Sequence, residues 1–244
     1  MKKYLVTFFS LLFIGIIAYS GYQLMKINED YADEAEIHEQ LLVYKPVKAH
    51  DPAGGPEQEP SKEIVNQTLI ELQWQYTDAV GWLTVPNTKI DYPFAQYTDN
   101  DYYLRRDING KQAAAGTLFI DYLCEKDFTS PNTIIYGHHM KNGSMFGTLK
   151  SFNDKAFFDA NRYGYIYLPY ENLTLAFFAY MVVDPATEKE IYQVALKDTY
   201  FDYIKQHARH YRDLGLTVDD RIVTLSTCAY EFNDARMVLL AKIV

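Results

Sequence analysis

The sequence predicts a mainly β domain, a barrel or a sandwich, with helices at its periphery. From Val80 onward, short apolar or aromatic runs alternate with turn residues. The chain contains 22 tyrosines and 14 phenylalanines, and aromatic and β-branched side chains suit half-buried pleated strands. A chain of 244 residues can hold one substantial domain plus appendages. We expect that domain to cover residues 61–244.

The N-terminal segment has a composition of its own. Residues 4–25 are uncharged and lie between Lys3 and Lys26, and a helix needs about 20 apolar residues to cross a bilayer. A cleavable signal peptide is the alternative, because residues 18–21 loosely fit a cleavage site, but its apolar region is typically about 7 to 15 residues. We therefore expect residues 1–26 to form a cytoplasmic tip and a transmembrane signal anchor, with the rest of the chain outside.

Residues 27–60 are expected to connect this anchor to the domain. Residues 28–42 are acidic, with apolar side chains at Ala35, Ile37 and Leu41 that indicate a short amphipathic helix. Four prolines and a glycine pair follow between residues 45 and 60, and this composition disfavours both helices and ladders. The pattern predicts a stalk that lets the domain stand away from the bilayer.

Helical spacing appears at two places in the domain. Ser61 and Glu63 are capping-type residues at the start of a helix that reaches Tyr76. Residues 199–212 have a second helical period, with basic residues late in the run. The expected strands cover residues 81–85, 116–121, 133–136, 163–168, 173–183, 221–228 and 236–244.

The charge of the chain excludes one class of partner. The formal net charge is −9, although the first 26 residues carry three lysines and no acid. The remainder is therefore more acidic still, which argues against a nucleic-acid partner. It also argues against the domain lying on an anionic membrane surface.

The two cysteines, Cys124 and Cys228, are the first candidates for chemistry. Outside the cell a pair of cysteines often forms a disulfide, and their number alone leaves that bridge open. Cys228 ends a strand in which alternation places it on the same face as Ser226. Arg236 opens the next strand, and antiparallel pairing at about 4.8 Å would bring its guanidinium to the thiol. A nearby positive charge favours the nucleophilic thiolate.

A cysteine nucleophile needs a proton partner, for which histidine is the usual residue. His138 and His139 follow the strand predicted over residues 133–136 and Gly137, whereas the other four histidines lie in the acidic N-terminal region or the second helix. A metal site from His138, His139 and Cys228 is less favoured, because adjacent histidines rarely converge on one ion. The pattern alone also leaves open a small buried cysteine and a surface arginine.

Four segments together resemble one known family. Thr224-Leu225-Ser226-Thr227-Cys228 resembles the sortase signature, in which a threonine, a leucine, any residue and a threonine precede the catalytic cysteine. Residues 80–83 with 90–93, residues 100–104 and residues 135–147 are similar to segments of class B sortases. The similarity spans residues 64–244.

The resemblance implies an eight-stranded β-barrel with N-terminal helices and a helix in the connection before the cysteine strand. It implies the catalytic residues His138, Cys228 and Arg236, and it assigns Cys124 no role. A disulfide to Cys124 would abolish the nucleophile. It also implies a groove for a sorting signal, lined by Asn100, Leu104 and Ser226.

The function implied is transpeptidation at the cell surface. Such an enzyme cleaves a C-terminal sorting signal of a secreted protein through a cysteine thioester and joins the protein to an amine of a peptidoglycan precursor. This chemistry needs no cofactor and no metal. Two alternatives stay open: a secreted cysteine endopeptidase that only hydrolyses, and an anchored envelope binding module whose cysteine is structural.

Overall fold

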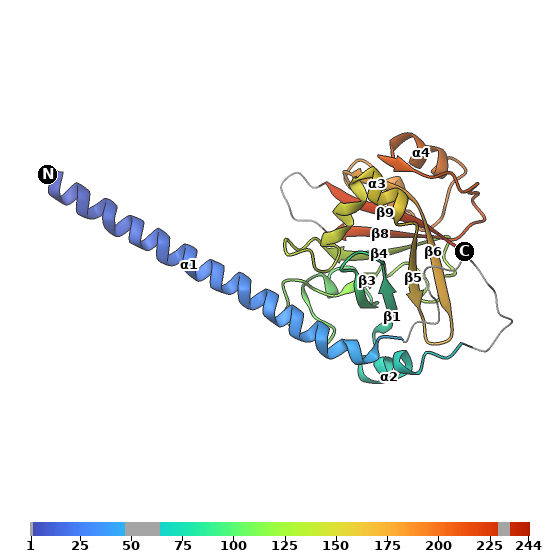
Figure 1. Ribbon diagram of the computed structural model, residues 1–244, viewed down its shortest axis with the longest axis horizontal. Coiled ribbons are helices and arrows are strands. Elements are labelled where there is room, and N and C mark those ends of the chain that lie inside the picture. The colour runs from blue at the N-terminus through green and yellow to red at the C-terminus, as the bar shows by residue number, and fades with distance from the viewer. Residues whose placement is uncertain (1, 47–63, 229–234) are drawn as a thin grey trace. The chain divides into compact units, whose positions relative to one another are not determined.

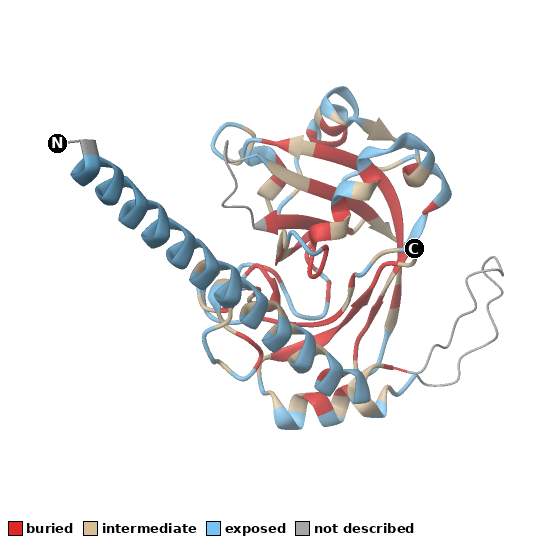
Figure 2. Ribbon diagram, turned by 60° about the vertical axis from the view of Figure 1, so that its left-hand side comes forward, coloured by how far each residue is buried: buried red, intermediate tan, exposed pale blue. Residues whose placement is uncertain are grey.

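The computed structural model describes residues 2–46, 64–228 and 235–244. It divides into two units, one up to Gln40 and one over Leu41–Val244. The first unit is almost entirely the helix α1 (Lys2–Leu41), which contains a stretch long and apolar enough to cross a membrane. Most of α1 is exposed (Figure 2).

The continuity of α1 corrects one expectation. The sequence suggested an apolar span followed by a separate acidic helix from residue 28, but one helix covers both. No proline lies within it and its last glycine is Gly21, so nothing between the apolar and acidic parts breaks the hydrogen-bond ladder. The predicted stalk over residues 45–60 lies largely outside the described residues and stays a prediction.

The short segment after α1 belongs to the second unit and is fastened to it. The 3-10 turn η1 (Leu42–Tyr44) is followed by Lys45, whose Nζ pairs with Asp91. The other carboxylate oxygen of Asp91 accepts hydrogen bonds from Trp82 Nε1 at 2.8 Å and Thr84 Oγ1 at 2.9 Å. One carboxylate therefore holds the entering chain against the first strand of the domain.

The helix α2 (Gln67–Gln75) begins later than residue 61. Its Leu69 and Leu72 are fully buried, as the helical spacing predicted. Asn66 is not helical because its backbone N–H donates to Pro169 O and its side chain bonds to Leu168 O. The proposed capping residues at positions 61 and 63 lie outside the described part of the chain.

Eight strands close into a barrel, which confirms the barrel and excludes the sandwich. Their order is β5-β1-β2-β3-β4-β8-β9-β6, and β6 pairs again with β5 (Figure 1). The pairs β2–β3 and β4–β8 are parallel, and the others are antiparallel. The strands are β1 (Ala79–Thr84), β2 (Asp91–Ala95), β3 (Leu118–Ile120), β4 (Asn132–His138), β5 (Tyr163–Tyr167), β6 (Asn172–Val183), β8 (Ile222–Cys228) and β9 (Arg236–Ile243).

Two elements differ from the expected set. β2 was missed as a strand because Pro93, which has no N–H, sits in its middle opposite Trp82. The second predicted helix is shorter, since α4 (Tyr200–His207) ends at His207 and the chain then forms the two-residue strand β7 (His210–Tyr211) on β6. The remaining elements are η2 (Tyr103–Arg105), η3 (Gly147–Asn153), α3 (Lys155–Ala160) and η4 (Lys189–Tyr192).

The barrel wall at β8 and β9 is buried on both faces. The inner face contributes Leu225 and Leu239 to the main core. The outer face contributes Val238 and Leu240 to a second cluster, in which they pack with Ile204 of α4. The strand alternation predicted for this segment is therefore confirmed from Ile222 to Leu225, whose apolar side chains divide between the two clusters.

Candidate active site

Three adjacent strands bring the predicted reactive residues to one edge of the barrel. β4 and β8 pair in parallel over their whole lengths, and the last pair is His138 with Cys228. β8 and β9 pair antiparallel as far as Ser226 with Val238. Two residues further along both strands come Cys228 and Arg236. Because neighbouring strands lie about 4.8 Å apart, the three backbone positions form a row across β4, β8 and β9 (Figure 1).

This row belongs to the outer face of the barrel. One residue pair back, Tyr136 lies beside Ser226. The ring of Tyr192, from η4, stacks on Tyr136 at 6.3 Å between centroids, and its hydroxyl is 3.1 Å from Ser226 Oγ. Since side chains of a strand alternate with period two, His138 continues the face of Tyr136, and the strand register pairs its backbone position with Cys228.

His138 is the last residue of β4 and not the first residue after it, which corrects the sequence-based placement. Its carbonyl accepts a hydrogen bond from Phe146 N at 2.9 Å, and His139 forms an isolated bridge with Met145. The preceding Gly137 allows this turn to fold back, because a β-carbon there would stand 2.8 Å from the Phe146 ring. A glycine is therefore required before His138, because any side chain at position 137 would displace Phe146, whose backbone N–H bonds to His138 O.

The environment of His138 favours the neutral imidazole. Burial lowers its pKa, the positive charge of Arg105 acts in the same direction, and together they bring the pKa to about 4. Arg105 ends η2 and directly follows Leu104, but it was not among the residues predicted for the site. At neutral pH the free protein therefore holds His138 ready to accept a proton.

A titration tests this electrostatic picture. In a Cys228→Ala variant, which removes coupling to the thiol, we expect the imidazole of His138 to titrate near pH 4 by NMR. Arg105→Gln should raise that pKa, because a neighbouring cation disfavours the imidazolium form. A pKa at the ordinary value of about 6.5, unchanged by Arg105→Gln, would contradict it.

Arg236 carries an unused hydrogen-bond donor. It is the first residue of β9, pairs with Val183 of β6 and is partly buried. Its Nε is buried and has no hydrogen-bond partner among the described residues. Because a buried donor without a partner costs about 1–3 kcal/mol, this N–H is suited to an acceptor that a ligand brings.

The three residues expected to line a substrate groove have different surroundings. Asn100 donates from Nδ2 to Asp121 at 3.0 Å and accepts from Tyr122 N at 3.1 Å. Leu104 packs in η2 against a small cluster around Phe119. Ser226 is fully buried, with its hydroxyl at Tyr192. Of the three, Ser226 lies nearest in the strand register to the row, one residue pair before His138 and Cys228.

Cys124 is a free, buried cysteine and therefore forms no disulfide with Cys228. Its Sγ donates to Asn132 O at 3.4 Å. Burial raises the pKa of its thiol to about 11, so almost none of it is thiolate at neutral pH. The small-hydrophobe interpretation of this residue fits its surroundings.

Several residues at the site were missed by sequence reasoning. Tyr136 lies inside a segment that the resemblance had already marked, residues 135–147, and Arg105 directly follows another, residues 100–104, so these segments were the available signal. Asp121, which ends a predicted strand, gave no sign that its carboxylate would reach Asn100 and Tyr136. Tyr192 gave none either, because it is 34 residues from Ser226 along the chain.

Comparisons with known proteins define the class of this barrel and its edge. A sortase-domain family model matches residues 83–244. Sortase B of Listeria monocytogenes is 32% identical over 252 aligned residues, which cover 100% of this chain and 98% of the relative. The chain therefore belongs to the sortase family, whose members are cysteine transpeptidases.

The solved structures that it resembles narrow the class. Sortase B of Bacillus anthracis, in a complex with the compound AAEK1, has a TM-score of 0.71 at 32% identity, covering 88% of this chain and 98% of the other. A sortase B–substrate complex of Staphylococcus aureus has a TM-score of 0.68 at 29% identity, covering 74% and 86%. These relatives place the chain among the class B sortases, and the enzyme interpretation is preferred over a non-catalytic binding module.

Proposed function

We propose that Cys228, His138 and Arg236 carry the transpeptidase reaction of this enzyme. The observation that supports this most strongly is the register of three neighbouring strands: His138 pairs with Cys228, and Arg236 lies two residues beyond the last β8–β9 pair. Residues 90 positions apart in the chain are thereby adjacent at one edge.

In the first half of the reaction, the sulfur of Cys228 attacks the scissile carbonyl carbon. Since His138 is neutral at neutral pH, the proton it later donates comes from the thiol of Cys228. The carbon–nitrogen bond then breaks, His138 protonates the leaving amine, and the substrate stays on Cys228 as a thioester.

In the second half, an amine attacks the thioester carbonyl. His138, again neutral, takes the proton from that amine, and the Cys228 thiolate leaves. Arg236 stabilises the oxyanion formed in both halves by charge-assisted hydrogen bonds, for which its free Nε–H is suited. The new bond is an amide, so the reaction conserves peptide-bond energy and needs no cofactor.

The substrates follow from the class. We propose that the enzyme cleaves C-terminal sorting signals of secreted proteins and joins them to an amine of a peptidoglycan precursor. A polar signal that begins with a small polar residue and proline is expected from the likeness to class B sortases. In this proposal Asn100, Leu104 and Ser226 shape the surface on which the signal binds.

The location also follows from α1. Its apolar part is long enough to span a bilayer, and the lysines at its N-terminal side favour a cytoplasmic N-terminus. We propose a single-pass cell-membrane protein with the barrel outside the cell, where both the secreted proteins and the wall precursor are accessible.

Product analysis tests the proposed function. The full chain in detergent is incubated with a peptide library and an excess of a small amine, and products are identified by mass spectrometry. We expect an amide-linked product in which the amine replaces the C-terminal part of the peptide. Free acid as the only product, with the amine and with a peptidoglycan-type acceptor alike, would favour the alternative of a cysteine endopeptidase.

A further inference from the structure

We propose that Asp121 is a positioning residue for substrate binding, acting through Tyr136 and Asn100, an inference that rests on the function proposed above. Asp121 directly follows β3 and is 6% exposed. Within the described residues its hydrogen bonds reach neither His138 nor Arg236, so we infer that its effect on catalysis passes through its partners.

The carboxylate of Asp121 is enclosed by donors from three segments. Its Oδ2 accepts from Tyr136 OH and from Asn100 Nδ2, each at 3.0 Å, and its Oδ1 accepts from Leu123 N at 3.0 Å. A buried carboxylate is tolerated only when it is hydrogen-bonded in this way. The free-energy cost of burying this carboxylate is offset by its hydrogen bonds. These bonds hold Tyr136 of β4 and the loop of Asn100 at one carboxylate oxygen.

The phenol that Asp121 holds is the centre of an aromatic stack. Phe119 lies beside Tyr136 in the strand register and their ring centroids are 5.3 Å apart. On its other side Tyr192 stacks at 6.3 Å with an interplanar angle of 19°. A phenol whose hydroxyl donates to a fixed carboxylate oxygen is held in one orientation, and this orientation sets where Tyr192 of η4 can lie.

The stack ends at the reactive row. Tyr192 reaches Ser226 through its hydroxyl, and Ser226 stands beside Tyr136, one residue pair before His138 and Cys228. The chain from Asp121 through Tyr136 and Tyr192 to Ser226 therefore spans the outer face next to the catalytic positions. A peptide placed on this face would contact the stack before it reached the thiol.

Steady-state kinetics can separate the effect of Asp121 on peptide binding from its effect on the chemical step. Asp121 sets the shape of the peptide-binding face, whereas the reacting atoms belong to residues it does not touch. Losing the carboxylate should therefore raise KM and leave kcat nearly unchanged, because the chemistry of a correctly bound peptide is the same.

The test uses Asp121→Asn, Tyr136→Phe and the double variant, each in the full chain. Asparagine keeps the size but turns an amide N–H₂ toward donors. With the library peptide that the wild-type enzyme cleaves fastest, we expect each single variant to raise KM about tenfold, the scale of a hydrogen bond to a charged group. The double variant should be no worse than the more severe single one, since both remove the same bond.

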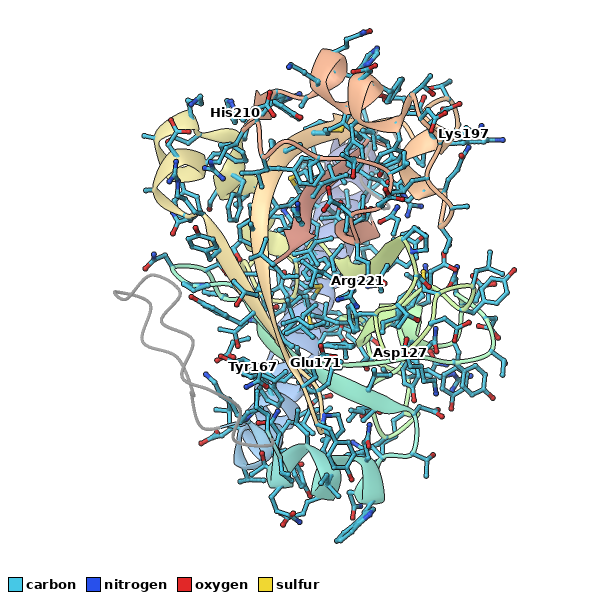
Figure 3. All side chains as sticks on the ribbon, turned by 90° about the vertical axis from the view of Figure 1, so that its right-hand side faces the viewer. Asp127, Tyr167, Glu171, Lys197, His210 and Arg221 are labelled. Carbon is cyan, nitrogen blue, oxygen red and sulfur yellow. The ribbon has the colours of Figure 1, made fainter. Side chains whose placement is uncertain are left out.

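Two controls separate positioning from general destabilisation. Asp127→Asn changes an exposed aspartate in the same β3–β4 connection (Figure 3). Its side chain accepts hydrogen bonds from the backbone N–H and the hydroxyl of Thr129. Cys124→Ala removes a buried side chain from the turn in which the backbone N–H of Cys124 donates a hydrogen bond to Asp121 O. Both should keep the wild-type KM, even where Cys124→Ala lowers the melting temperature.

The outcomes are decisive for the inference and for the function separately. The positioning role would be overturned if the increases in KM from Asp121→Asn and Tyr136→Phe multiplied in the double variant. It would also be overturned if the KM of Asp121→Asn equalled that of Asp127→Asn. In either case, turnover by the wild type would still uphold the proposed function. If the wild type turns over no library peptide, the proposed function fails. Urea unfolding of the same four proteins then decides whether Asp121 and Tyr136 are coupled, and additive losses would refute the inference.

Discussion

Replacing Cys228 by alanine should abolish transpeptidation, with a fall in kcat/KM on the order of 10⁶, the scale on which an enzyme loses its nucleophile. Alanine removes the sulfur and leaves the backbone pairing of β8 with β4 in place. Without sulfur no thioester can form, and the proposed mechanism has no second route to the product. Peptide turnover and intact-mass detection of the acyl-enzyme measure the effect directly.

The second cysteine of the chain supplies the matched control. Cys124 is 5% exposed and the pKa of its thiol is raised to about 11 by burial, so it offers no thiolate near neutral pH. Cys124→Ala should retain the acyl-enzyme and most of the turnover. A thiol-directed reagent should modify the Cys124→Ala protein once and the Cys228→Ala protein not at all.

Full activity of the Cys228→Ala protein would end the assignment. So would an acyl-enzyme whose mass tag maps to Cys124. A hydrolytic product that persists in Cys228→Ala at the wild-type rate would point to another nucleophile in the chain.

The strands of the barrel were predictable because they obey a local rule, whereas the choice of a barrel over a sandwich came from the resemblance to sortases. In residues 222–228 every second side chain faces the core, and Val223 and Leu225 are fully buried there as the alternation requires. The same rule fixed the face of Ser226 without knowledge of any partner. β2 was not predicted because a proline within an apolar run argues against a strand. Pro93 has no N–H to donate, and the barrel accommodates it within β2, opposite Trp82.

What escaped prediction at the site depends on contacts between distant segments. Arg105 lowers the pKa of His138, but along the chain strand β3 and the rest of strand β4 lie between the two residues. The bonds of Asp121 to Asn100 and Tyr136 likewise need the loop before η2 and strand β4 to meet. Sequence spacing within one element carries no information on contacts between distant segments, whereas the resemblance to sortases supplied the three proposed catalytic residues together.

Arg236→Lys should lower kcat/KM by about 10²-fold, the scale of one lost oxyanion donor. Lysine keeps the positive charge but lacks both the planar fork and the Nε–H. In the structure that Nε is buried and has no hydrogen-bond partner within the described residues. A role based on charge alone would let lysine substitute, so the variant separates geometry from charge. The measurement is steady-state turnover of the same peptide at saturating amine.

Arg221→Lys is the corresponding control at the opposite end of β8. Arg221 donates from its guanidinium to Phe128 O at 3.3 Å (Figure 3), and β8 carries the chain from there to Cys228. The same chemical change at that end should cost stability at most and leave kcat/KM within about twofold, as surface substitutions usually do. If Arg236→Lys matched Arg221→Lys, the guanidinium would not be the oxyanion donor. The free Nε–H would then need another acceptor, such as a carbonyl of the bound signal, and a rise in KM without loss of kcat would identify it.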